Sequence, residues 1–370
     1  MKKIFIIILM LFVLTSCKEK ASQIEKSGDA VTIGILISAK DTSLKKRMKV
    51  LKALIKERGY LDNGDEIKFK PISLQDNFAE DFTKACEEEN FISIISFLTS
   101  PDTLSLLDQI KACQTPVIAT IATYSSLNKE EYISRICLNN EIQAHVAASY
   151  LRDELFIPEV SVLSDRKNEF SLELSSFFIK RYAKLGGSIE LLIDTKEILE
   201  DPKGVVGKLK EEETDTLYLS IDAEKTRYFL KLIEKEKMKF KILAHDGLFS
   251  AFKERYPQDI SMLDGVFVVD NYADTTVLDK KLKPFFQSFK DTGVDIDTYD
   301  LLSYDAVNLL RSGLNTCAKE DKVCLNAYLR NAQNIEGAVE KISMEDGNAY
   351  RAVYVNEIKG SQMHLKVRVY

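Results

Sequence analysis

The chain has 370 residues, of which 45% are hydrophobic and 29% are charged, and its formal net charge is −6. That length is enough for two domains of ordinary size, and the apolar content supports a hydrophobic core in each. An acidic chain lacks the basic face that neutralises phosphates, so its composition argues against nucleic-acid binding and against direct adhesion to anionic lipid.

The N-terminus has the layout of an export signal. Two lysines precede an unbroken apolar run over residues 4–14, which has the length of a signal-peptide core and is short for a membrane span. The run ends in the sequence LTSC at residues 14–17, which resembles the bacterial lipobox. This resemblance implies that residues 1–16 are a lipoprotein signal peptide and that Cys17 is acylated, for example with palmitate. The alternative is an ordinary cleavable signal with a cysteine nearby by chance. Residues 17–29 are polar and are expected to form a flexible tether.

From residue 30 onward, strand and helix patterns alternate. Residues 30–38 (AVTIGILIS) form a continuous aliphatic run, typical of a strand buried on both faces. Apolar residues then recur at helical spacing over residues 44–55, with Asp41 or Thr42 as the N-cap and Gly59 as the stop. Further strands are expected near residues 66–74, 93–98, 116–121, 133–137, 159–164, 188–193, 216–221, 239–244 and 265–270. Helices are expected near residues 78–89, 102–112 and 140–156, and helical segments separate the later strands.

This alternation implies right-handed crossovers and mainly parallel sheets. About ten such strands exceed one compact sheet, so we expect an α/β fold with two doubly wound lobes joined by a hinge. The end of the chain differs: three helices near residues 277–291, 298–314 and 321–333 precede alternating runs over 349–358 and 363–370, which suggest a hairpin around Lys359-Gly360.

Such an ending indicates that the chain crosses between the lobes more than once. We expect residues 30–139 and 273–341 in the first lobe and residues 140–272 and 342–370 in the second. Ligands of open α/β sheets bind at the carboxyl ends of the strands, so the two facing lobes should form a cleft.

Five cysteines remain besides Cys17, so at least one of them is unpaired. Cys317 and Cys324 flank a short polar loop and could close a small ring. Cys86 and Cys113 each fall near the end of an expected helix and would meet if those helices are neighbours. Cys137 is expected to be a buried free thiol. No pair has the two-residue spacing of a zinc site, so no metal is expected.

The usual catalytic signatures are missing. The chain has no nucleophile elbow, phosphate-binding loop, dinucleotide glycine motif or zinc-protease helix. Its three histidines are His145, His245 and His364, and an isolated histidine is more often structural than catalytic. His245 and Asp246 are adjacent, but neighbouring strand residues point to opposite faces and cannot form a dyad. We therefore expect a binding protein without a cofactor rather than an enzyme.

Two hydroxyl-rich segments follow successive strands. Residues 96–103 (SFLTSPDT) place Ser100 at a helix N-terminus, where hydroxyl and backbone N–H groups suit a carboxylate. Residues 116–127 (PVIATIATYSSL) run from the next strand into a similar turn. Simple helix capping would explain either segment alone, whereas both together favour one shared anion site. Asp246 lies just past a strand of the other lobe, where it would either meet an ammonium group across the cleft or cap the next helix.

The chain is similar to the leucine/isoleucine/valine-binding family of type 1 periplasmic binding proteins, the amino-acid receptors of ATP-driven importers. The resemblance runs from about residue 32 to 347 and depends on the order and spacing of several individually weak segments. These segments are VTIGILIS (31–38), LQDN (74–77), FLTSPDT (97–103), QTPVIATIATYSSL (114–127) and LLSYDAVNLL (301–310).

The resemblance also implies roles for seven pocket residues: Ser100, Thr123 and the backbone at Ile121 for the ligand's α-carboxylate, Asp246 for its α-ammonium, Phe170 as a cover, and Asp222 and Tyr299 as lining. The chain departs from the family pattern at two places. Ala39-Lys40 replaces a small residue followed by glycine. Lys40 either enters the pocket or, as the cost of burying lysine favours, points to solvent. Asp246 is shorter than the usual glutamate, which leaves room for a bulkier ligand or a water.

These features predict a monomeric, lipid-anchored solute-binding protein of the cell envelope, located outside the cytoplasm. It would capture an amino acid or a related zwitterion by hinged closure and deliver it to an ABC permease. The alternative is an envelope scaffold or sensor lipoprotein of the same fold without a transport role, since fold alone does not give function.

Overall fold

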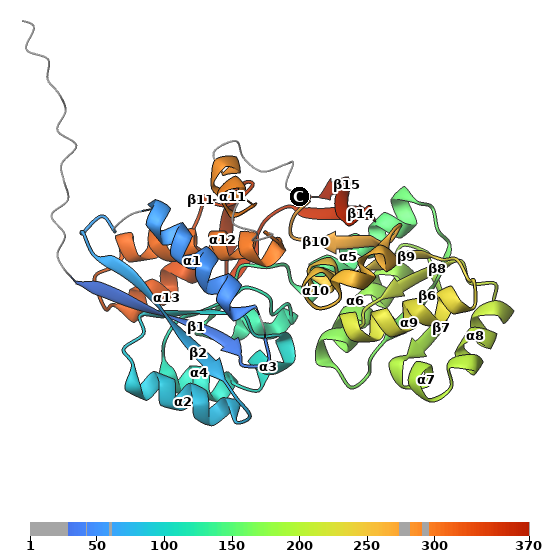
Figure 1. The fold of residues 1–370 in the computed structure, drawn as a ribbon, viewed down its shortest axis with the longest axis horizontal. Coiled ribbons are helices and arrows are strands. Elements are labelled where there is room, and N and C mark those ends of the chain that lie inside the picture. Colours follow the sequence, from blue (N-terminus) through green and yellow to red (C-terminus); the bar gives the residue numbers. More distant parts are fainter. Residues whose placement is uncertain (1–28, 42, 59–60, 274–281, 291–295, 370) are drawn as a thin grey trace, which may run out of the picture.

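A computed structural model describes residues 29–41, 43–58, 61–273, 282–290 and 296–369. They form two α/β lobes, each built on its own sheet, which lie side by side along the long axis of the molecule (Figure 1). The doubly wound, two-lobe class is therefore confirmed. The expected signal peptide, Cys17 and most of the tether lie outside the described residues, as do Thr42, Gly59 and the first part of the helix expected at 277–291.

The first lobe contains an eight-stranded sheet in the order β11-β12-β13-β5-β4-β3-β1-β2. Its first five strands pair in parallel: β1 (Ala30–Ser38), β2 (Glu66–Leu74), β3 (Ser93–Ser96), β4 (Val117–Ala119) and β5 (Ile133–Arg135). The helices of this lobe are α1 (Leu44–Arg58), α2 (Phe78–Glu88), α3 (Ser100–Leu104), α4 (Leu107–Cys113), η1 (Ser125–Lys129), α11 (Lys283–Lys290), α12 (Thr298–Thr316) and α13 (Lys322–Asn331). The single helix expected near 102–112 is thus divided into α3 and α4.

The second lobe contains a seven-stranded sheet in the order β15-β14-β10-β9-β8-β6-β7. Its strands are β6 (Glu159–Ser164), β7 (Ser188–Asp194), β8 (Thr216–Leu219), β9 (Lys241–Ala244), β10 (Phe267–Asp270), β14 (Val353–Lys359) and β15 (Gln362–Val369). The helices are α5 (Asn140–Ser149), the π-helical turn η2 (Tyr150–Glu154), α6 (Glu169–Lys184), α7 (Thr195–Glu200), α8 (Pro202–Glu211), α9 (Ala223–Lys235), α10 (Leu248–Arg255) and η3 (Pro257–Leu263). The hairpin expected at the end of the chain is formed by β14 and β15, with positive φ angles at Gly360 and Ser361, as a two-residue hairpin turn requires.

One lobe boundary differs from the sequence expectation. The short strands β11 (Ile335–Glu336), β12 (Lys341–Glu345) and β13 (Asn348–Tyr350) extend the first sheet. The last crossover therefore lies at residues 351–352, and the expected boundary at 341 is wrong. The run expected as one strand over 349–358 is shared between the two sheets. Both pieces carry buried side chains, so the alternation of apolar residues continues through the crossover and hides it.

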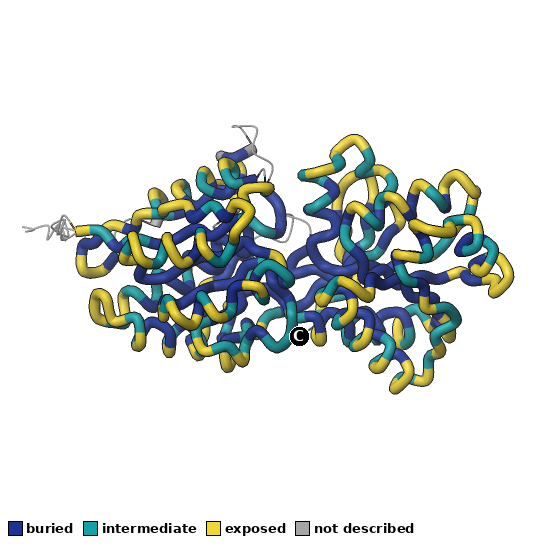
Figure 2. The backbone as a smooth tube through the Cα atoms, turned by 90° about the horizontal axis from the view of Figure 1, so that it is seen from below, coloured by how far each residue is buried: buried dark blue, intermediate teal, exposed yellow. Residues whose placement is uncertain are grey.

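The three crossovers between the lobes meet at Arg351, whose guanidinium is buried. It donates to the carbonyl oxygens of Ile136 (3.2 Å) and Asn271 (3.3 Å), which lie on the other two crossovers. It also forms an ion pair of 3.0 Å with Asp305 of α12 and lies over the ring of Tyr272. We call these five residues the crossover cluster. Figure 2 shows that buried backbone continues through this connection from one sheet to the other.

Two disulfides form in the first lobe. Cys86 pairs with Cys113, which joins α2 to α4, and Cys317 pairs with Cys324, which joins the end of α12 to α13. Cys137 is a buried free cysteine, as expected, and burial raises the pKa of its thiol to about 12. Both pairings that the sequence left open are therefore present. In the described part of the chain, no helix is long and apolar enough to cross a membrane.

Candidate functional site

A cavity of about 210 Å³ lies between the two lobes, at the carboxyl ends of their parallel strands. All seven residues expected to bind ligand line it: Ser100, Ile121, Thr123, Phe170, Asp222, Asp246 and Tyr299. The remaining lining residues were not singled out in the sequence: Thr99, Pro101, Asn168, Ala223, His245, Gly247, Leu248, Ala251 and Arg255. The structure thus brings the expected residues together. Lys40, by contrast, is exposed and does not line this cavity, so its expected orientation toward solvent is confirmed.

The wall from the first lobe joins the two hydroxyl-rich segments. Thr99 caps α3 by accepting a hydrogen bond from the Asp102 N–H, which frees the Ser100 side chain from capping. The Ser100 hydroxyl oxygen instead accepts hydrogen bonds from the backbone N–H groups of Thr123 (3.0 Å) and Tyr124 (3.1 Å). Its own proton remains available for donation. The Thr123 hydroxyl is buried and has no partner among the described residues. This wall therefore offers two hydroxyl groups to an anion.

The opposite wall places the buried carboxyl group of Asp246 in the cavity. The backbone N–H of Asp246 donates to Gln143 (3.1 Å), and its carboxylate accepts a hydrogen bond from the Asn271 amide (3.1 Å). The N-cap of α10 is Gly247, with φ +72° and no side-chain cap, so Asp246 does not cap the helix. A Cβ at position 247 would collide with the Tyr299 hydroxyl. Glycine is needed there, because it tolerates the positive φ angle and lets Tyr299 approach.

Asp246 lies in an acidic and buried environment. Burial and the neighbouring Asp270 together raise the pKa of Asp246 to about 8, although hydrogen bonds with Asn271 and Gln143 act in the opposite direction. Burial also raises the pKa of Asp270, to about 6. Neither carboxylate forms an ion pair with a described residue. Because an unpaired buried charge is costly, this wall suits a ligand that carries a positive charge.

Phe170 and His245 form a packed pair beside Asp246. Phe170 lies in the first turn of α6, and its ring meets the His245 ring edge-on at 4.9 Å. The two His245 ring nitrogens face the backbone oxygens of Asp246 (2.6 Å) and Ile221 (2.9 Å). Burial lowers the pKa of His245, which favours the neutral ring. His245 therefore shapes the cavity and makes no contact with the Asp246 carboxylate, as the strand geometry predicted.

The two less certain lining residues have structural partners. Asp222 caps α9 by accepting from the Lys225 N–H (2.9 Å), and it forms an ion pair with the Lys225 ammonium (2.5 Å). The Tyr299 hydroxyl donates weakly to the Gly247 carbonyl across the cleft (3.4 Å). Burial and the nearby Asp246 raise the pKa of Tyr299 well above its usual value, so the phenol stays protonated. Asp222 is thus already neutralised, whereas Tyr299 closes one side of the cavity.

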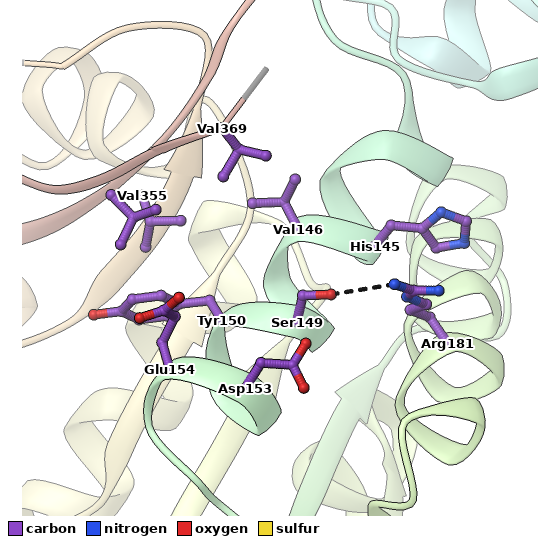
Figure 3. A pocket seen from close by; sticks show the side chains of 10 residues that line it. His145, Val146, Ser149, Tyr150, Asp153, Glu154, Arg181, Val355 and Val369 are labelled. Atoms are coloured by element: carbon purple, nitrogen blue, oxygen red, sulfur yellow. Dashed lines mark hydrogen bonds between the residues drawn. The ribbon is translucent and has the colours of Figure 1, made fainter.

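Two other cavities contain none of the expected residues. One, of about 350 Å³, lies on the second lobe between α5, α6 and the C-terminal hairpin (Figure 3). Its valines form an apolar side, and Arg181 donates a long hydrogen bond to Ser149 at 3.5 Å. The other, of about 630 Å³, lies beside β12 and Arg351. Among the described residues, no group of three His, Cys, Asp or Glu side chains is arranged to hold a metal ion.

A family model for periplasmic binding proteins matches residues 74–362. The chain belongs to the periplasmic binding protein family. The resemblance found in the sequence to the type 1 members that bind leucine, isoleucine and valine is thereby confirmed. Family membership implies a location outside the cytoplasm, and members of this family are solute-binding proteins that are typically not enzymes.

Solved structures share the fold of this periplasmic binding protein. The leucine-binding protein LivK of Thermotoga maritima is 18% identical with a TM-score of 0.79, over 92% of this chain and 98% of that one. LivJ of Streptococcus pneumoniae in complex with isoleucine is 16% identical with a TM-score of 0.77, over 92% and 100%. A solute-binding protein of Rhodopseudomonas palustris in complex with 3,4-dihydroxybenzoic acid is 16% identical with a TM-score of 0.74, over 92% and 97%. These identities establish the fold alone. No curated protein sequence is significantly similar to this chain.

Proposed function

We propose that this protein is a monomeric, lipid-anchored solute-binding protein that captures an amino acid and delivers it to an ABC permease. One observation carries the proposal: the cavity between the lobes has two available hydroxyl groups on one wall and a buried carboxylate without a cationic partner on the other. An intact polar cavity of this kind favours small-molecule capture over the scaffold or sensor role.

The two walls match the two charged groups of a zwitterion. Ser100 and Thr123 donate hydrogen bonds to the α-carboxylate, and the Ile121 backbone lies beside them. Asp246 accepts from the α-ammonium, and hydrogen bonds to charged groups are the stronger ones in proteins. The structures of similar fold contain both an amino acid and an aromatic acid. An aromatic acid has no ammonium group and would leave Asp246 unpaired, so the cavity favours an amino acid.

Ion pairs between the lobes support a hinged closure. Arg47 of α1 is buried and pairs with Asp297 (2.9 Å) and Asp300 (2.5 Å) of its own lobe. It also contacts Glu254 of α10, on the other lobe. Burial raises the pKa of Glu254 to about 7, although Arg47 opposes that shift. The pair between Arg47 and Glu254 can separate when the lobes open, while the pairs within the first lobe keep the guanidinium neutralised.

Two further contacts cross the cleft. Glu173 of α6 accepts a hydrogen bond from the Ser125 N–H of the first lobe (2.9 Å), and the Tyr299 hydroxyl reaches the Gly247 carbonyl (3.4 Å). A ligand that touches both walls binds the closed form better than the open one. It therefore shifts the equilibrium toward closure by that difference in affinity.

Calorimetry with a panel of amino acids and 4-hydroxybenzoate tests the proposed function. Because the pKa of Asp246 in the free protein is about 8, binding of an ammonium group at pH 7 must ionise it and release about one proton. Affinity for an amino acid should therefore rise about tenfold per pH unit from pH 6 to 7.5 and level off above pH 8.

Saturating ligand should also lower the radius of gyration measured by small-angle scattering. Binding of the aromatic acid alone, with no proton release, would contradict the proposal, and an unchanged radius would reject closure.

The lipid anchor depends on Cys17. Replacing Cys17 with serine should abolish acylation and release or mislocalise the protein, because a hydroxyl does not replace the thiol that carries the lipid. Labelling cells with radioactive palmitate and fractionating their membranes measures both effects. Wild-type levels of label and of membrane association in the Cys17→Ser variant would show that the anchor lies elsewhere.

A further inference from the structure

One face of α10 forms the second-lobe wall beyond Asp246. Leu248, Ala251 and Arg255 line the cavity from this helix, and their spacing of three and four residues places them on one face. Arg255 is exposed, and it forms no ion pair or hydrogen bond with any described residue. The helix thus presents an apolar strip, formed by Leu248 and Ala251, that ends in the positive charge of Arg255, which has no described partner.

The other charges of the cavity are already matched. Asp222 is paired with Lys225. Asp246 faces the position proposed for the ammonium group, and the hydroxyls of Ser100 and Thr123 face the α-carboxylate. Lys40, which could have met an acidic ligand, points to solvent. A neutral side chain on the ligand would therefore leave Arg255 as a cation without a partner at the cavity wall.

The length of α10 sets how far the Arg255 guanidinium lies from the Asp246 carboxylate. Arg255 is seven residues after Leu248, the first residue of α10, and at a rise of about 1.5 Å per residue its backbone lies about 10 Å farther along the helix axis. Long helical side chains lean toward the N-terminus, which brings the guanidinium back toward Asp246. Leu248 and Ala251 lie between the two charges. A ligand side chain of two or three methylene groups that ends in a carboxylate matches this order, because its methylene groups would contact Leu248 and Ala251 and its carboxylate would reach Arg255.

We infer that Arg255 binds a carboxylate at the end of the ligand's side chain, so that the preferred ligand is an acidic α-amino acid such as glutamate or 2-aminoadipate. This inference rests on the proposed function and narrows the class of ligand from amino acids in general to acidic ones. The planar guanidinium can hold a carboxylate by two hydrogen bonds. The same charge repels the side chains of lysine and arginine, so Arg255 also excludes basic amino acids.

Titration of the purified protein with L-glutamate, L-2-aminoadipate, L-glutamine and L-leucine tests the inference. At least one of the two acidic ligands should bind about tenfold more tightly than glutamine, a modest ratio because Arg255 is exposed to solvent. Arg255→Gln should remove that preference, and Arg255→Lys should keep part of it. Lys253→Gln is the matched control, because it removes a positive charge from α10 at a side chain that packs near Phe249 and does not line the cavity. This control should leave the preference unchanged.

The possible failures are distinguishable. If glutamine and leucine bind as tightly as the acidic ligands and Arg255→Gln changes nothing, the inference is wrong and the proposed function stands. If Lys253→Gln lowers the preference as much as Arg255→Gln does, the effect is a general one of net charge and the assignment to Arg255 is wrong. If none of the four amino acids binds, and the wider panel gives no amino-acid ligand, the proposed function fails together with the inference.

Discussion

Asp246→Ala will lower the affinity for the amino-acid ligand by about a hundredfold or more. The closed cavity removes the ligand's ammonium group from water, and without Asp246 that charge has no partner from the second lobe. Removing one partner of a buried charge pair typically costs about 3–5 kcal/mol, and every 1.4 kcal/mol is a factor of about ten in affinity. Calorimetry at pH 7.5 measures the loss. The proton release on binding should disappear in the same variant, because the group that ionises is gone.

Thr123→Ala provides the companion measurement on the first lobe. It removes one hydrogen bond to a charged group, worth about 1.5–3 kcal/mol, and should lower affinity by about ten- to a hundredfold. The rise of affinity with pH should persist, since Asp246 remains. Unchanged affinity in both variants would show that the site is wrongly assigned, and the scaffold alternative would then be favoured.

The stability of the free protein gives an independent control on Asp246. Its folded pKa of about 8 lies far above the value of about 4 for an unfolded chain. A carboxyl whose pKa is raised by folding contributes stability that is fully present below about pH 4 and is lost as the pH rises through about 8. Asp246→Asn should therefore melt higher than the wild type at pH 8.5, and the difference should narrow as the pH falls. A variant that fails to bind for lack of folding would melt lower at every pH.

Arg351→Met should lower the free energy of unfolding by about 3–5 kcal/mol, because the substitution leaves the buried Asp305 carboxyl without its cationic partner. Methionine keeps much of the side-chain volume, so the loss reports on the charge and hydrogen bonds of Arg351 rather than on packing. Chemical denaturation at pH 7 measures it. The double variant Arg351→Met/Asp305→Asn should recover part of the loss, since it no longer buries a carboxyl without its cation. A loss below about 1 kcal/mol, or no recovery in the double variant, would show that the ion pair does not hold the crossovers together.

Much of the fold could be predicted because parallel strands buried on both faces appear as short aliphatic runs. β1, β2 and β6 have the expected bounds, and the ends of the other parallel strands lie within two residues of the expected positions. The crossover at residues 351–352 could not be predicted from the same signal. Periodicity reports only whether a side chain is buried, and Ala349 before Arg351 and Ala352 after it are both buried, each in a different lobe. Arg351, between the two strands, pairs with Asp305, and this contact joins residues far apart in sequence, so periodicity does not report it.

The seven residues expected at the site could be identified in the sequence because they directly follow strands or match the family pattern, and all seven line the cavity. Asn271 and Gln143, which hold Asp246 in place, were not singled out, because their role depends on side-chain contacts between distant elements. Arg255 left a weak signal: Leu248, Ala251 and Arg255 share one face of a helix that starts directly after Asp246. Helical spacing shows that these side chains lie on one face, but not that the face is turned toward a cavity.

The route of the chain also constrains the order in which the two lobes can be completed during folding. The core of the first lobe combines side chains from β1, near the start of the chain, with side chains from α12, α13 and β13, and therefore needs residues up to about 350. The five parallel strands of the second sheet lie within one continuous stretch, from β6 to β10. These strands can pair while the first lobe still lacks α12 and α13, which supply part of its core. The first lobe is therefore completed last, and until α12 and α13 are synthesised the apolar surface that they later cover is exposed to other chains.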